Sequence, residues 1–250
     1  MSSANGNGSY KVIGTRPIRH DGTDKVTGRA VYGGDTRLPG MLYGQVLRSP
    51  HAHARIKSID TSKAEALEGV RAVITYKDLP LTNPDDIVDL GEGPERLKYM
   101  RDNVLASDKA LYRGHAVAAV AATSPHIADD ALSLIEVEYE VLDSVVNIQD
   151  AMKDGSPLVH EDMTTEEKGE DSGKSSNIAS LVRYDLGDPD SAFAEAAVLV
   201  EREVDTATVH QGYIEPHNAT AMWNPDVQLS VWTSTQGAFT TQKQLGAVLD

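Results

Sequence analysis

The run AVAAVAAT at residues 116–123 constrains this 250-residue chain more than any other sequence feature. A continuous apolar run of this length is typical of a buried β-strand. Ser124 and Pro125 follow it as an N-cap and a first helical position, which predicts a helix directly after the strand. The alternating residues at 137–142 then predict a second strand with one face in water.

An earlier part of the chain has the same alternation of strands and helices. Ser62 and Glu65 have the three-residue spacing of a capping box, and Gly69 stands where that helix is expected to end. Strands are predicted around this helix at 42–49, 55–60 and 70–76. The pattern predicts an α+β or mixed α/β fold.

Two segments have a different composition. Residues 80–103 are rich in proline, glycine and acidic residues, which predicts an irregular excursion. Residues 160–177 carry six acidic residues against two lysines and almost no large apolar side chain. Such a segment buries too little surface to offset the entropy of ordering it, so an exposed linker is expected there.

The last quarter of the chain again shows regular patterns. Asp188 and Pro189 are a cap and a first helical position. A strand is expected at 198–204, and a hairpin from 219–223 and 227–232 across a turn at 224–226. The chain then reads as a strand, a polar turn that holds Gln236, and a helix.

Composition excludes several classes of function. The formal charge of −15 argues against non-specific binding to nucleic acid or to an anionic membrane. The absence of cysteine excludes disulfides, thiolate-ligated zinc, iron–sulfur ligation and a cysteine nucleophile on this chain. No apolar run predicts a transmembrane segment, and the polar N-terminus does not resemble a secretory signal, so a cytoplasmic location is expected.

No motif in the chain forms a complete active site by itself. There is no dinucleotide-binding glycine motif, P-loop or nucleophile elbow. His51 and His53 form an H-x-H pair that either binds a metal or, as we favour, has a structural role. His210, Glu215 and His217 lack a known metal-ligand spacing. Glu215 is better explained as a turn carboxylate that anchors backbone N–H groups than as a metal ligand or general base.

Several longer segments together resemble a known family. They are distributed over nearly the whole chain, and they are KVTGRA (25–30), LPGMLYGQVLRSPHAHARI (38–56), YRGHAVAAVAAT (112–123), HQGYIEPHNATA (210–221) and WTSTQGAF (232–239). In order and content they resemble the N-terminal part of the large molybdopterin-binding subunit of the xanthine dehydrogenase, aldehyde oxidase and carbon monoxide dehydrogenase family. His115 and Ala116 depart from the acidic residue and proline that commonly follow this glycine in the family.

The resemblance implies a domain order. After a flexible N-terminal arm at 1–19, residues 20–145 are expected to form the family's a/b hammerhead domain. An acidic linker at 146–177 is then expected to lead to the first segment of a molybdopterin-binding domain at 178–250.

The resemblance also implies a chemistry. Members of the family hydroxylate aldehydes, N-heterocycles and related substrates with water as the oxygen source. Their molybdenum is held by a pyranopterin, in some cases as the cytosine dinucleotide, and electrons leave through [2Fe-2S] clusters and FAD on partner subunits. In the family, the glutamine of the STQ segment hydrogen-bonds an oxo ligand of the molybdenum. That residue is Gln236 here, with Gly237 and Phe239 as neighbours; the alternative is that Gln236 only caps the helix.

The resemblance implies that part of the molybdenum site is supplied elsewhere. The family's glycine-rich loop and its catalytic glutamate have no counterpart in this sequence, so no catalytic residue and no direct metal ligand is assigned. We therefore expect a second chain to complete the site and this chain to be inactive alone. The alternative is a non-catalytic assembly subunit or a gene fragment. The identity of the small-molecule substrate stays open.

Overall fold

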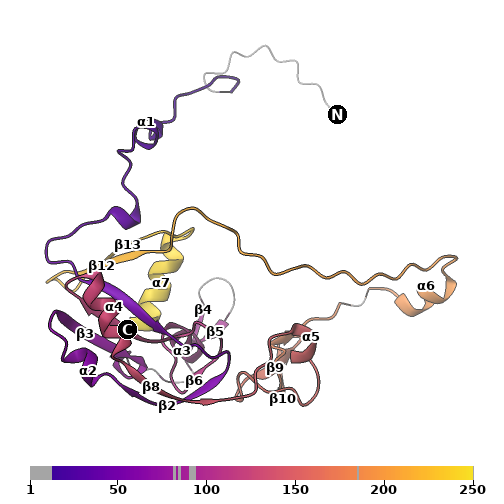
Figure 1. The fold of residues 1–250 in the computed structure, drawn as a ribbon. Helices are drawn as coiled ribbons and strands as arrows, with labels where there is room; N and C mark the ends of the chain where they lie inside the picture. The colour runs from indigo at the N-terminus through magenta and orange to yellow at the C-terminus, as the bar shows by residue number, and fades with distance from the viewer. Residues whose placement is uncertain (1–12, 81–82, 84–85, 90–93, 185, 250) are drawn as a thin grey trace. The chain divides into compact units, whose positions relative to one another are not determined.

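The computed structural model describes residues 13–80, 83, 86–89, 94–184 and 186–249 (Figure 1). The chain divides into two compact units, Met1–Pro39 with His210–Gln236 and Gly40–Val209 with Gly237–Asp250. This division groups residues 20–39 with the C-terminal hairpin, whereas the sequence assigns them to the hammerhead domain. The predicted boundaries at 145 and 178 do not coincide with it and stay predictions.

The larger unit contains most of the regular structure. Its helices are α2 (Ser62–Glu65), η2 (Tyr76–Asp78), α3 (Leu97–Val104), α4 (Pro125–Ser133), α5 (Ile148–Ala151), α6 (Pro189–Glu195) and α7 (Ala238–Leu249). Its strands are β1 (Tyr43–Arg48), β2 (Ala54–Asp60), β3 (Val70–Thr75), β4 (Ile87–Asp89), β5 (Pro94–Arg96), β6 (Lys109–Ala110), β7 (Ala116–Ala122), β8 (Glu136–Val141), β9 (Thr164–Glu167), β10 (Glu170–Ser175) and β11 (Ser180–Leu181). The smaller unit contains α1 (Gly22–Val26), η1 (Gly33–Asp35), β12 (Ala219–Trp223) and β13 (Leu229–Thr233).

Strand β7 is the central strand of an antiparallel sheet of order β1-β7-β3. Its residues Ala118, Val120 and Ala122 are buried on the face that packs against helices. On the other face, Val117 is also buried. The strand predicted from AVAAVAAT is therefore confirmed.

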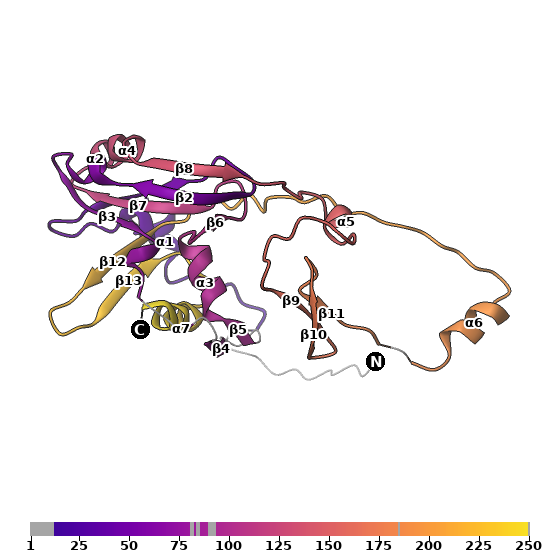
Figure 2. The ribbon, with the colours of Figure 1, turned by 90° about the horizontal axis from the view of Figure 1, so that it is seen from below.

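Helix α4 covers this sheet through two alanines. Ser124 begins the helix as its N-cap, because its Oγ accepts a hydrogen bond of 3.2 Å from the Ile127 N–H. Ala128 and Ala131 are fully buried in one cluster with the alanines of β7. Side chains this small let the helix backbone approach the sheet closely. Figure 2 shows α4 beside α2, which contributes to the same cluster.

A second antiparallel sheet has the order β6-β2-β8. In β8, Val137 and Tyr139 are half-buried, whereas Glu136, Glu138 and Glu140 are exposed. The alternation predicted for 137–142 is confirmed up to Glu140, but Val141 is 64% exposed. The strands predicted at 42–49, 55–60 and 70–76 are also present as β1, β2 and β3.

Helix α2 begins one residue earlier than predicted. Thr61 is its N-cap, and the Thr61 hydroxyl donates to Glu65 Oε1 at 2.5 Å, whereas the Ser62 N–H donates to Asp60 Oδ1. The capping box predicted for Ser62 and Glu65 is therefore wrong, because the glutamate pairs with the preceding threonine. Gly69 lies between this helix and β3 with a φ of 93°.

The segment 80–103 is more regular than its composition predicts, because it contains β4, β5 and most of α3. Leu97 and Arg101 of α3 are buried, and the Arg101 guanidinium lies 5.4 Å from the Tyr76 ring centroid. These tertiary contacts stabilise a short helix whose sequence alone gives a weak signal. The prediction of an irregular excursion is wrong for this part.

His115 joins the end of α3 to the loop before β7. Its imidazole is fully buried, and Nδ1 accepts a hydrogen bond of 3.2 Å from the Leu111 N–H. Nε2 must then carry the proton, which it donates to the Asp102 carbonyl at 2.7 Å. The ring also stacks on Tyr112, with centroids 4.5 Å apart. Burial lowers the pKa of His115, which keeps the imidazole neutral.

The acidic segment 160–177 is exposed along β10 but is not irregular. Strands β9 and β10 pair as an antiparallel hairpin, and β11 pairs with β9 in parallel. Each strand supplies the hydrogen-bonding partner that composition cannot reveal. The expectation of a plain linker therefore misses this small sheet.

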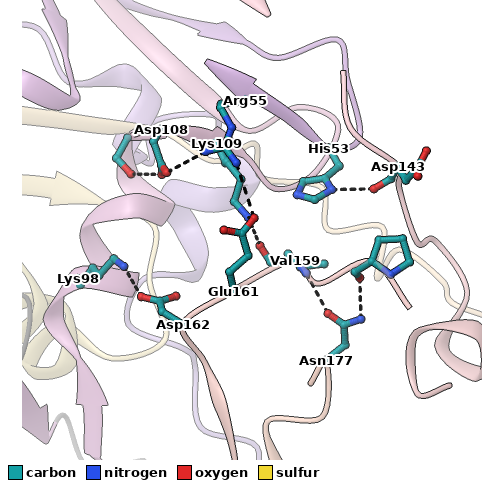
Figure 3. A network of polar contacts seen from close by, with 12 residues as sticks. His53, Arg55, Lys98, Asp108, Lys109, Asp143, Val159, Glu161, Asp162 and Asn177 are labelled. Carbon is teal, nitrogen blue, oxygen red and sulfur yellow. Dashed lines mark hydrogen bonds and ion pairs between the residues drawn. The ribbon is translucent and has the colours of Figure 1, made fainter. Parts of the chain in front are cut away.

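A polar network connects residues 159–162 to the rest of the larger unit (Figure 3). The buried Lys109 ammonium donates to the Val159 carbonyl at 2.8 Å and lies 3.4 Å from Glu161. Lys98, which is partly exposed, forms an ion pair with Asp162. A buried ammonium without partners would be costly, so these contacts hold the segment in place.

The strand predicted at 198–204 is absent. These residues have no regular structure, and Val198, Val200 and Val204 are at least three-quarters exposed. A strand is stable only when a neighbour completes its hydrogen bonds, and none of the described residues pairs with this segment. By contrast, the Asp188 cap of α6 is confirmed, because its Oδ1 accepts from the Ser191 N–H at 3.0 Å.

None of the helices within the described ranges is both long and apolar enough to cross a membrane.

We predict that Gly69→Ala destabilises the fold more than Gly114→Ala. Both glycines have φ near 92°, but a Cβ at Gly69 would lie 2.7 Å from Ile127 Cδ1, whereas a Cβ at Gly114 has no atom within 4 Å. Gly114→Ala measures the backbone strain alone, about 1–2 kcal/mol. Gly69→Ala should cost about 1–3 kcal/mol more from overpacking, measured by urea unfolding. Equal losses would contradict the packing at Gly69.

We also predict that His115 makes stability depend on pH. Because its pKa is lowered in the folded state, the unfolded chain binds the proton first, near its ordinary pKa of about 6.5. The contribution of His115 to the free energy of unfolding is fully present above the unfolded-state pKa. It is lost as the pH falls toward the folded-state pKa.

Unfolding of His115→Gln in urea at pH 8 and pH 5 tests this. The variant should lose about 2 kcal/mol or more at pH 8, where two buried hydrogen bonds are removed, and should show a smaller further loss at pH 5. Burial also lowers the pKa of His160, so some pH dependence remains. Replacement of the exposed His126 by glutamine is the control. An unchanged pH dependence in His115→Gln would refute the role of His115.

Candidate functional site

Strands β12 and β13 form an antiparallel hairpin that ends three residues before Gln236. The register runs from Ala219 opposite Thr233 to Trp223 opposite Leu229. The Asn224 N–H closes the turn by donating to the Gln228 carbonyl at 2.8 Å. The hairpin predicted from sequence is confirmed, and it presents the Gln236 segment at one of its ends.

Gln236 lies in the bend between β13 and α7, and it is exposed. Its carboxamide makes no hydrogen bond to any of the described residues. A capping residue would bond the free N–H groups of the helix, and Gln236 does not do so. Its donors and its acceptor are therefore available to a ligand.

Gly237 and Phe239 follow in the other compact unit. The Gly237 carbonyl accepts two hydrogen bonds of 3.0 Å from Thr241, one from the backbone N–H and one from the hydroxyl. A Cβ at Gly237 would approach Thr240 Oγ1 to 3.3 Å, so glycine suits this close turn. Phe239 is 81% exposed at the start of α7.

A hollow of about 380 Å³ adjoins the end of the hairpin. It is lined by His217, Asn218, Ala219, Thr233 and Ser234. Asn218 Oδ1 and Ser234 Oγ are buried there without a hydrogen-bond partner among the described residues. Polar atoms left in this way cost about 1–3 kcal/mol each, so the hollow is suited to a ligand that offers N–H donors.

Contacts within the smaller unit hold the Asn218 amide in one orientation. Its Nδ2 donates to the Pro216 carbonyl at 3.0 Å, which leaves Oδ1 as the free atom. The Asn218 carbonyl accepts from Thr233 Oγ1 at 2.9 Å. Gly33 of η1 packs against the same amide, and a Cβ at this position would lie 2.4 Å from Oδ1.

Sequence reasoning did not identify Asn218 or Ser234. What marks them is a buried side-chain oxygen without a hydrogen-bond partner. This burial depends on how η1 and the hairpin pack together. A sequence pattern contains no such information.

The structure does not bring the predicted metal-ligand candidates into one set. His53 Nδ1 lies 2.8 Å from the Asp143 carbonyl, and His51 packs edge-on against Tyr139. His210 and His217 both contact the Tyr213 ring, with centroids 5.0 Å and 4.6 Å away. The residues that the structure describes include no group of three acidic or histidine side chains able to hold a metal ion.

Glu215 does not anchor the turn as predicted. It is exposed, and it makes no hydrogen bond or ion pair within the described part of the chain. The proline that follows it gives an extended backbone, which directs the carboxylate into water.

Two domain families match the chain. The aldehyde oxidase and xanthine dehydrogenase a/b hammerhead domain matches residues 27–143, and the molybdopterin cofactor-binding domain matches residues 170–250.

Known proteins match across both domains. The nicotinate dehydrogenase large molybdopterin subunit of Eubacterium barkeri is 32% identical over 240 residues, which is 96% of this chain and 51% of that subunit. The quinoline 2-oxidoreductase of Pseudomonas putida 86 superposes with a TM-score of 0.76 at 31% identity, over 94% of this chain and 28% of that one. The reconstituted CO dehydrogenase of Oligotropha carboxidovorans superposes with a TM-score of 0.78 at 32% identity, over 95% of this chain and 29% of that one.

The chain thus spans about half the length of the first relative and less than a third of the two solved chains. The fold is mixed α and β, with a hammerhead domain followed by a molybdenum-cofactor-binding domain. Both domain matches and these relatives agree on the family of this chain. It belongs to the xanthine dehydrogenase and aldehyde oxidase family of molybdenum enzymes.

Proposed function

We propose that this chain forms one wall of the molybdenum site in a hydroxylase. The enzyme hydroxylates an aldehyde, an N-heterocycle or a related small molecule with water as the oxygen source. The observation that carries the proposal is the free carboxamide of Gln236, which lies in a segment that matches the molybdopterin cofactor-binding domain.

The residues present fit a molybdenum–pyranopterin cofactor. Asn218 Oδ1 and Ser234 Oγ are buried acceptors that lack partners, and a pyranopterin offers several N–H donors. When bound, the cofactor supplies a redox-active metal that takes up the electrons of the substrate. The proposal includes the cytosine dinucleotide form of the cofactor.

Gln236 positions the cofactor in this proposal. Its side-chain Nε2 donates a hydrogen bond without adding a charge, and so it stabilises negative charge that develops during the reaction. Gly237 keeps the chain close to the first turn of α7, and Phe239 is an exposed aromatic residue on that helix. Residues that orient a metal group in this way typically contribute a factor of about 10 to 100 in activity.

The remaining parts of the enzyme are proposed to come from partners. A second molybdopterin-binding chain completes the site, so this chain is inactive alone. Iron–sulfur and FAD subunits carry the electrons away, in the cytoplasm.

Gln236→Met tests the role of the amide, because methionine keeps the length of the side chain and removes its hydrogen bonds. In the complex assembled with the partner chains, substrate oxidation should fall about tenfold or more. Activity is measured by dye reduction with a panel of aldehydes and N-heterocycles, and molybdenum by elemental analysis.

Gln242→Met is the matched control, since Gln242 is an exposed glutamine on α7. It should retain full activity. A Gln236→Met complex with full activity would favour a non-catalytic assembly subunit. A wild-type complex without molybdenum and pterin would refute the proposed function altogether.

Asn218→Leu tests the hollow beside the hairpin. Leucine has a similar volume but no acceptor, so pterin content should fall about tenfold at limiting cofactor, whereas the melting temperature should not fall. Pterin is measured by fluorescence after oxidative release. Asn224→Leu, in the hairpin turn, should bind pterin normally. Equal pterin content in all three proteins would exclude the hollow from the cofactor site.

A further inference from the structure

Residues 197–209 are a long exposed stretch of chain after α6 that has neither helix nor strand (Figure 1). Val198, Val200 and Val204 are 78%, 76% and 80% exposed. The backbone N–H and C=O groups of the stretch make no hydrogen bond to any of the described residues. Both the apolar side chains and the backbone groups are therefore available to a partner.

The side chains of this stretch alternate between two kinds. In an extended chain, successive residues point to opposite faces. Apart from Arg202, the even-numbered face is entirely β-branched, with Val198, Val200, Val204, Thr206 and Thr208. The odd-numbered face is acidic at its centre, with Glu201, Glu203 and Asp205. Because β-branched residues pack well on a pleated surface, the stretch has the pattern of a strand that lacks only a neighbour.

The β-branched face is suited to burial. Its three valines would form one contiguous apolar surface in an extended chain, and such a surface is typical of a protein interaction site. Arg202 is compatible with this, because its hydrocarbon stem can lie along apolar neighbours while the guanidinium reaches the margin of the strand. The free backbone groups of the stretch match those of an unpaired sheet edge, which is how extended segments add to a sheet.

Charge decides which partner fits. A second copy of this chain would place the three acidic residues of each copy on the same face of a paired ribbon, and like charges opposite each other destabilise a sheet. The formal charge of −15 on each copy adds to this repulsion. A sheet edge with lysine or arginine beside the acidic face would instead be attracted.

We propose that residues 198–208 dock as an added β-strand on the open sheet edge of the second molybdopterin-binding chain. That edge is apolar on one face and basic on the other. Backbone hydrogen bonds hold the strand, the valines pack on the apolar face, and the acidic residues pair with the basic side chains. This docking rests on the proposed function, because that proposal supplies the second chain.

Hydrogen–deuterium exchange of this chain, alone and in the complex with the second chain, tests the docking. In the isolated chain, the amides of 198–208 should exchange rapidly, because they have no hydrogen-bond partner. In the complex, their exchange should slow at least about tenfold, since strand pairing occupies the backbone N–H groups.

Variants on each face distinguish strand pairing from a loose contact, with the affinity of the two chains measured by biolayer interferometry. Val200→Asp places a charge on the apolar face and should weaken association at least about tenfold. Val146→Asp is the matched control, because Val146 is 88% exposed outside the stretch, and it should bind as the wild type does. Since both valines are exposed in the isolated chain, neither change should lower its melting temperature.

The acidic face has its own test. The double variant Glu201→Lys and Glu203→Lys should weaken association about tenfold at low salt and less at high salt, because salt screens the charges. Glu68→Lys, at an exposed position between α2 and β3, should leave the affinity within about twofold of a single charge change at the surface.

Unchanged exchange at 198–208 in the complex would overturn the proposal, as would equal affinity of Val200→Asp and Val146→Asp, or no association of the two chains. Molybdenum content separates this result from a failure of the proposed function. A complex that holds molybdenum but leaves 198–208 unprotected refutes only the docking. A complex that protects 198–208 but holds no molybdenum or pterin supports the docking and refutes the proposed function.

Discussion

The close contact between alanines of β7 and alanines of α4 is the constraint on which the larger unit depends. Ala118 and Ala122 of the central strand meet Ala128 and Ala131 of the helix, all fully buried. Because alanine has only a methyl group, the two backbones can lie close together, and any larger side chain would force them apart. The neighbours β1 and β3, and the helix α2, take their places around this contact.

The second determinant is polar. The neutral imidazole of His115 links the C-terminal end of α3 to the loop before β7 through both of its nitrogens. The Lys109 ammonium links β6 to residues 159–162 through the Val159 carbonyl and Glu161. Buried polar groups are costly unless every hydrogen bond is made, so each of these residues specifies one arrangement of the segments that it joins. Together they hold the end of α3 and residues 159–162 in place, which no hydrophobic pattern would predict.

Some residues of the candidate site could be identified from the sequence, and others only from the packing. The STQ segment located Gln236 correctly at a strand–turn–helix junction, because turn and helix signals are local in sequence. The role of Gln236 at the metal centre stays a proposal, as do the parts of Gly237 and Phe239. Asn218 and Ser234 could not be identified in advance. Their unpaired oxygens result from the packing of η1 against the hairpin, where Gly33 leaves just enough room for the Asn218 amide.

The sequence by itself determined the strands β1, β2, β3, β7 and β8, the caps of α4 and α6, the hairpin before Gln236 and the family. These features depend on side-chain periodicity, capping chemistry and short motifs, all of which act over a few residues. Only the tertiary structure decided that α3 forms, that the acidic segment becomes a hairpin, and that residues 198–204 do not become a strand. In each of these cases the outcome depends on a partner distant in sequence, because a short helix needs a surface to cover and a strand needs a neighbour to complete its hydrogen bonds.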